Sequence, residues 1–114
     1  MTLLEKYISD LPNAKVLVLF GGSPHRRDEV VRSLSTIKGL TIIGTLSEEE
    51  GISTIMKLPK VDIVLIGGRY TNDQRNRIKK FISENHPHIL ISEPGYDYLY
   101  EEDQIKMNII KLMQ

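Results

Sequence analysis

Two short glycine segments hold the residues of this sequence that are best suited to bind a ligand. They are Gly21-Gly22-Ser23 and Gly67-Gly68-Arg69, and each directly follows a run of apolar residues. Glycine lets a ligand approach the backbone and tolerates a positive φ angle. A helix that begins at Ser23 would point unpaired N–H groups toward the same place, which favours an anion.

Four further side chains near these segments would extend that chemistry. His25, Arg26 and Arg69 are candidate donors to an anion, and Glu93 is a candidate acceptor. Arg26 lies in the first turn of a predicted helix, where a cation opposes the helix dipole and an anionic partner would relieve the mismatch. Two alternatives stay open: Arg26 is solvated or paired with Asp28 or Glu29, and the glycine pairs are only tight turns before helices.

The familiar catalytic and nucleotide-binding motifs are missing. The sequence has no cysteine, which excludes thiol catalysis, disulfides and thiolate metal sites. It contains neither a P-loop nor a G-x-S-x-G motif, and its first glycine pair lacks the third glycine of G-x-G-x-x-G. His86 and His88 have no third ligand nearby, so we interpret them as loop residues. We therefore predict no catalytic residue and no metal site, and the sequence identifies no cofactor.

Alternating strand and helix patterns predict the elements that position the glycine segments. Apolar runs at residues 16–20, 40–45, 61–66 and 88–92 are typical of strands in a parallel sheet covered on both faces. The expected strand order is 2-1-3-4, in one flavodoxin-like or Rossmann-like domain of three layers that spans residues 1–114. Ligands bind such sheets where the strand order reverses, which here lies between the two strands that end in Gly-Gly.

Capping residues mark the predicted helices. Ser23 begins a helix that ends near Ile37, before Gly39, and Ser47 with three following glutamates begins the next. A capping box at Thr71 predicts a third helix that ends near residue 85.

The two ends of the chain carry separate predictions. A capping box formed by Thr2 and Glu5, with apolar residues at helical spacing, predicts an extra N-terminal helix over residues 2–11. Residues 96–100, with three alternating tyrosines, either form a short fifth strand or remain irregular. The final helix, residues 103–113, is apolar on more than one side, which predicts a homodimer formed through the C-terminal segment.

From residue 15 onward the order of elements resembles the receiver domain of bacterial response regulators, and residues 61–66 are similar to its third strand. The resemblance implies a phosphoacceptor aspartate after that strand and an acidic, Mg²⁺-binding pair after the first strand. Gly67 and Gly21-Gly22 occupy these positions here. Ser92 matches the Ser/Thr that ends the family's fourth strand, but no strand ending in the family's lysine follows. The resemblance therefore implies a degenerate receiver-like module that is not phosphorylated by the family's mechanism.

Composition and charge argue against several classes of function. Fifteen basic and fifteen acidic residues give no net charge, so we expect no nucleic-acid partner. We expect a cytoplasmic protein, because no signal peptide and no membrane span are predicted. The leading hypothesis is a non-catalytic module that acts through protein contacts. The alternatives are a binder of a phosphorylated or nucleotide ligand at the glycine segments and, less favoured, a small enzyme that uses His25 or Glu93 as its acid or base.

Overall fold

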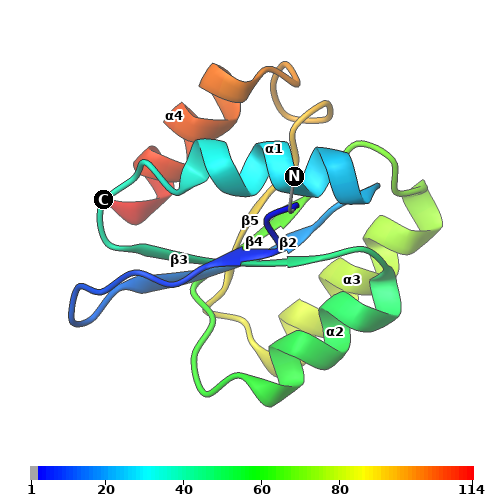
Figure 1. Cartoon of the computed structure of the whole chain (residues 1–114). Coiled ribbons are helices and arrows are strands. Elements are labelled where there is room, and N and C mark those ends of the chain that lie inside the picture. Colours follow the sequence, from blue (N-terminus) through cyan, green and yellow to red (C-terminus); the bar gives the residue numbers. More distant parts are fainter. Residues whose placement is uncertain (1–2) are drawn as a thin grey trace.

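The computed structural model describes residues 3–114 and contains a five-stranded, mostly parallel sheet (Figure 1). The strand order is β1-β3-β2-β4-β5, and only the β1–β3 pair is antiparallel. The strands are β1 Lys6–Tyr7, β2 Lys15–Phe20, β3 Leu40–Thr45, β4 Ile63–Ile66 and β5 Leu90–Ser92. The order of the four parallel strands confirms the predicted 2-1-3-4 arrangement.

In the part of the chain that the structure describes, four helices cover the two faces of the sheet. Figure 1 shows α1 and α4 on one face and α2 and α3 on the other. Their bounds are α1 Pro24–Leu34, α2 Glu48–Lys57, α3 Asn72–Asn85 and α4 Glu102–Met113. Among residues 3–114, no helix is both long enough and apolar enough to cross a membrane.

Local capping fixes where the first three helices begin. The side chains of Ser23 and Ser47 accept hydrogen bonds from the third residue beyond each of them, and Thr71 forms the predicted capping box. The first helix ends at Leu34 rather than near Ile37, and Gly39 adopts a φ of 75° in the turn that follows. The three predicted starts are therefore confirmed.

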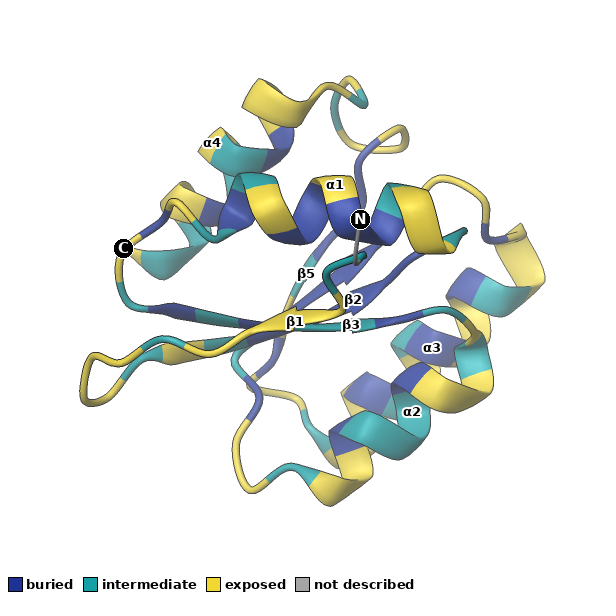
Figure 2. Ribbon diagram, in the orientation of Figure 1, coloured by how far each residue is buried: buried dark blue, intermediate teal, exposed yellow. Residues whose placement is uncertain are grey.

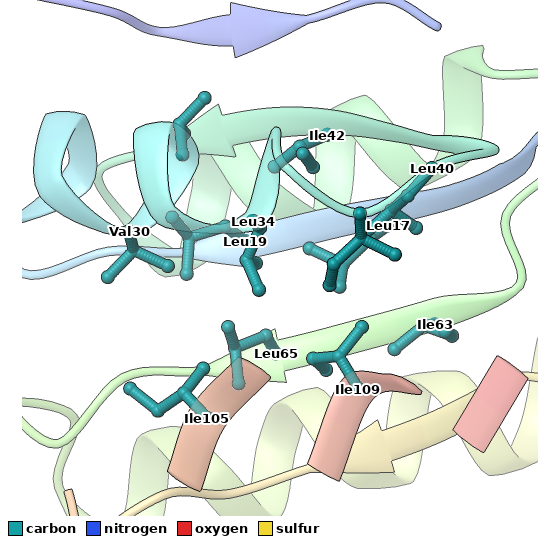
Figure 3. Packing of buried hydrophobic residues seen from close by; sticks show 12 residues of the cluster. Leu17, Leu19, Val30, Leu34, Leu40, Ile42, Ile63, Leu65, Ile105 and Ile109 are labelled. Carbon is teal, nitrogen blue, oxygen red and sulfur yellow. The ribbon is translucent and has the colours of Figure 1, made fainter. Parts of the chain in front are cut away.

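The hydrophobic core has two halves, one on each face of the sheet (Figure 2). In the half beneath α1 and α4, Ile105 and Ile109 of α4 face Leu65 of β4 (Figure 3). Burying a side chain of this size stabilises the fold by roughly 2 kcal/mol. In the second half, α2 and α3 pack against the side chains that β2 and β4 present on the other face of the sheet.

The N-terminal segment is not a helix, so the prediction for residues 2–11 is wrong over the part that the structure describes; Thr2 lies outside it. Residues 6–7 form the antiparallel edge strand β1. The Gly44 amide donates to the carbonyl of Glu5 at 2.8 Å, and the Leu4 amide donates to Asp28 Oδ1 at 2.6 Å. These partners lie far along the chain, and they outweigh the local helical pattern.

Residues 96–100 do not add a strand to the sheet; the fifth strand is β1 instead. A single bridge joins Pro94 to Tyr98, and Gly95 turns the chain with a φ of 88°. Tyr98 and Tyr100 pack against the core below α1 and α4, whereas Tyr96 is exposed. The three tyrosines therefore do not form one continuous surface.

Candidate functional site

A cleft of about 360 Å³ lies between the loops that follow β2 and β4. The two strands are neighbours in register, with Phe20 opposite Ile66, so their carboxyl ends bring the two glycine segments together. Seven of the predicted site residues line the cleft, together with Glu29 and Tyr100, which the sequence did not indicate; the seven are Gly22, Ser23, His25, Arg26, Gly67, Gly68 and Arg69.

Two predicted residues lie outside the cleft. Gly21 lines an adjoining hollow of about 200 Å³ that shares Gly22 and Arg69 with the cleft. Glu93 is buried and forms ion pairs with Arg75 at 2.9 Å and with Lys79 at 3.0 Å. Glu93 is therefore a structural counter-ion in this fold, and its carboxylate does not line the cleft.

The first loop leads directly into a helix. Ser23 has an extended backbone, and its Oγ accepts the amide of Arg26 at 3.2 Å. Within the described chain, the amide of Gly22 donates to no protein group, and neither do those of Gly68 and Arg69 on the facing loop. Unpaired amides at a helix start and in a turn form a favourable environment for an anion.

Gly22 and Gly67 are required for space rather than for a left-handed backbone, whereas a Cβ on Gly68 would meet nothing closer than the Tyr100 ring at 3.9 Å. Only Gly39 and Gly95 have positive φ among the described glycines. A Cβ on Gly22 would lie 2.6 Å from Cδ of Arg69, and one on Gly67 would lie 2.9 Å from the carbonyl oxygen of Phe20. A side chain at position 22 would therefore displace Arg69, and one at position 67 would collide with the backbone of β2.

A buried arginine holds the second loop in place. The guanidinium of Arg75 donates to the carbonyls of Gly67 at 2.6 Å and Tyr70 at 3.1 Å, and to Glu93 at 2.9 Å. Its outer face stacks on the ring of Tyr96, with 4.1 Å from Cζ to the ring centroid. Arg75 was not among the predicted site residues.

One sequence signal could have revealed Arg75. It lies three and seven residues before Ile78 and Ile82, and all three are buried on the same side of α3. An arginine in a buried helical stripe requires several partners, because burying an unpaired charge is costly. The position of Arg75 in this stripe thus indicates a buried polar network, but it does not identify Glu93 as the carboxylate that pairs with the arginine.

Tyr70 joins the two loops and lines the hollow that adjoins the cleft. Its hydroxyl donates to the carbonyl of Gly21 at 3.0 Å, and its ring meets Phe20 edge to face. Burial, followed by the negative charges of Glu50 and Glu48, raises the pKa of Tyr70 to about 12. The phenol therefore stays protonated and keeps donating at alkaline pH values where an exposed tyrosine ionises.

The cations at the cleft differ in how they are compensated. Arg26 donates from Nε to the Tyr100 hydroxyl at 2.8 Å, lies over that ring and contacts Glu29 at 3.4 Å. Burial lowers the pKa of Arg26, but the hydrogen bond and the nearby Tyr100 and acidic groups outweigh it, so its pKa is raised overall. Arg69 makes no ion pair or hydrogen bond with any described residue. The cleft therefore carries a positive charge without a protein counter-charge.

A larger hollow elsewhere offers different chemistry. It has a volume of about 760 Å³ and runs along α2, with Gln74 of α3 at its edge. Its lining combines the apolar side chains of Ile52 and Met56 with the carboxylates of Glu48 and Glu49. With the two carboxylates outnumbering the single cation of the lining, Lys57, this surface is less suited to an anion than the cleft.

The described residues contain no group of three or more histidine, aspartate or glutamate side chains that could hold a metal ion. Comparisons with protein-family models, with curated proteins and with solved structures find no match. The fold itself therefore gives the classification: an α/β protein with alternating strand–helix units and a mostly parallel five-stranded sheet.

Proposed function

We propose that this protein is a binding module for a small anionic ligand, of the phosphorylated-metabolite or nucleotide class, and that the ligand occupies the cleft between the two glycine loops. The observation that carries the proposal is the convergence of unpaired amides from both loops with the uncompensated guanidinium of Arg69. The cleft also lies at the reversal of strand order, where ligands of open α/β sheets bind.

The expected binding mode uses main-chain groups first. The oxygens of a phosphate accept hydrogen bonds from the amides of Gly22 and Gly68, and the dipole at the start of α1 adds a favourable potential. Arg69 then supplies a charge-assisted hydrogen bond. Arg26 contributes less, because Tyr100 and Glu29 already engage its guanidinium.

The positions of the two candidate acid–base residues argue against a catalytic function. Glu93, one of the two candidate acid–base residues, is engaged by Arg75 and Lys79. His25 lines the cleft, but no carboxylate hydrogen-bonds to it among the described residues, so it lacks a group that would orient it for proton transfer. A binding role therefore requires fewer assumptions than a catalytic one.

A second candidate is the receiver-like module that acts through protein contacts. The exposed apolar residues of α4 favour it, since Met107 and Ile110 are 62% and 37% exposed. The two candidates are compatible, because the cleft and the outer face of α4 are separate surfaces.

The test is a screen of nucleotides, sugar phosphates and inorganic phosphate by thermal shift, followed by calorimetry on each hit. A ligand that binds only the folded state raises the melting temperature. We expect Arg69→Ala to weaken binding by about tenfold to a hundredfold, the usual loss for a charged hydrogen bond.

Lys80→Ala is the matched control, since it removes one positive charge from an exposed position on α3. It should leave the affinity unchanged. The proposal fails if no compound in the panel binds, or if Arg69→Ala and Lys80→Ala bind every hit as tightly as the unmodified protein.

A further inference from the structure

The outer face of α4 carries an exposed apolar surface that the fold itself does not use. Met107 and Ile110 are 62% and 37% exposed. They border a groove of about 360 Å³ whose other lining residues are Tyr98, Gln104, Asn108, Lys111 and Gln114. Figure 2 shows this exposed side of α4 facing away from the sheet.

The position of this surface is fixed by the opposite face of the same helix. Ile105 and Ile109 are fully buried against the sheet, and Asn108 accepts a hydrogen bond from Ser92 of β5 at 2.8 Å. The outer face of α4 therefore cannot turn inward to bury Met107.

The edge strand β5 exposes an apolar residue on the face of the sheet that α4 covers. Leu90 of β5 is 45% exposed, and it lies two residues before Ser92, so both side chains project from the face of the sheet that α4 covers. With only three residues, β5 is too short for sheet extension to be the main contact. A helix face is the more suitable docking element.

The charges along α4 are arranged symmetrically about Met107. Asp103 precedes it by four residues and Lys111 follows it by four, and all three side chains are exposed on one row of the helix. Gln104 and Ile110 lie three residues to either side. A second, antiparallel α4 related by a two-fold axis at Met107 would bring each Asp103 opposite Lys111 of the partner subunit.

We propose that the protein forms a homodimer in which two α4 helices pack antiparallel about Met107. The self-complementary order of acidic, apolar and basic residues is what selects a second copy as the occupant, because an isologous interface requires one patch to match itself. The exposed methionine of α2 lacks this symmetry: Ile52, not an acidic residue, precedes Met56 by four residues, and Lys60, four residues after it, lies beyond the end of the helix at Lys57.

Sedimentation equilibrium and light scattering coupled to size exclusion test the proposal on the whole chain. We expect a species of twice the 13.0 kDa chain mass at protein concentrations near 100 μM, a range in which interfaces of even modest affinity are populated. Met107→Asp should raise the dissociation constant at least about tenfold, as truncating or charging a central apolar contact does. Met56→Asp, at a comparably exposed methionine of α2, should leave the dissociation constant unchanged.

Charge exchange tests the antiparallel register. Asp103→Lys and Lys111→Asp should each weaken the dimer, because each places like charges opposite one another. The double variant should recover most of the lost affinity. Thermal melts of every variant separate a weakened interface from an unfolded chain.

Three results would overturn the proposal. They are a monomer at about 100 μM, a dimer that Met56→Asp disrupts and Met107→Asp does not, and a double charge variant that associates no better than the single ones. None of these results bears on ligand binding at the cleft, which the variants of Arg69 test separately.

Discussion

The loops that end β2 and β4 begin with the same Gly-Gly pair but are supported in different ways. After β2, Ser23 caps a helix that starts at the next residue, so the support comes from adjacent groups. After β4, the chain runs through four residues before the cap at Thr71. There the support comes from Arg75, whose guanidinium binds two loop carbonyls and the carboxylate of Glu93.

This difference shows that the same Gly-Gly dipeptide can be held in place either by neighbouring residues or by residues far along the chain. Losing a local helix cap lowers the free energy of unfolding by about 1 kcal/mol, whereas breaking a buried ion pair lowers it several times more. The second loop should therefore be the more sensitive to mutation, even though its glycines look identical in sequence.

The largest expected effect follows from removing the support of the second loop. Arg75→Ala leaves Glu93 with Lys79 as its remaining ion-pair partner and leaves the carbonyls of Gly67 and Tyr70 without their donors. We expect a loss of about 3–5 kcal/mol in the free energy of unfolding, measured by chemical denaturation.

Arg77→Ala is the matched control on the same helix. Arg77 pairs with Glu48 at 2.7 Å on the surface, and its side chain is 58% exposed. Its loss should cost less than about 1 kcal/mol. Equal losses at the two positions would contradict the supporting role of Arg75.

A smaller effect is expected from the hydroxyl that links the two loops. A tyrosine in the unfolded chain ionises near pH 10, while burial raises the pKa of Tyr70 to about 12. Between these values the folded state retains a proton that the unfolded state loses, so stability falls as the pH rises, by about 3 kcal/mol in total, or roughly 1.4 kcal/mol for each of the two pH units.

Tyr70→Phe should remove this loss of stability at alkaline pH. At neutral pH it should cost about 1 kcal/mol, because the carbonyl of Gly21 loses its donor. The measurement is denaturant unfolding at a series of pH values from neutral to strongly alkaline. A variant that loses stability with rising pH as steeply as the unmodified protein would exclude Tyr70 as the source.

The smallest changes in stability are expected at the glycines themselves. A Cβ at Gly22 meets the flexible side chain of Arg69, whereas one at Gly68 meets the Tyr100 ring at an ordinary 3.9 Å. Gly22→Ala should therefore displace Arg69 and weaken ligand binding, at a cost to stability below about 1 kcal/mol. Gly68→Ala should change stability by less than about 1 kcal/mol and should disturb binding less. A larger loss of affinity in Gly68→Ala than in Gly22→Ala would contradict the proposed role of Arg69 in the cleft.

The parts of the fold that depend on neighbouring residues were predictable from sequence. The starts of three helices at Ser23, Ser47 and Thr71 followed from capping chemistry, and the parallel strand order followed from the alternation of strands and helices. The meeting of the two glycine segments followed in turn from that order, because neighbouring parallel strands end at the same edge.

The parts that depend on distant partners were not predictable in this way. Residues 3–11 carry a helical pattern, yet the carbonyl of Glu5 pairs with Gly44, and Arg27 of α1 forms an ion pair with the Glu5 carboxylate at 3.2 Å. Glu93 follows a strand and was assigned to the cleft, but its partner Arg75 lies 18 residues away. No local spacing identifies either pairing.

Binding at the cleft is tested most directly by an amide-resolved NMR titration with a phosphorylated ligand identified by the thermal-shift screen. The proposed binding mode predicts saturable shifts at the amides of Gly22, Ser23, Gly68 and Arg69, with the same dissociation constant at each and a weaker one in Arg69→Ala. Shifts confined to other parts of the molecule, or an unchanged affinity in Arg69→Ala, would contradict it.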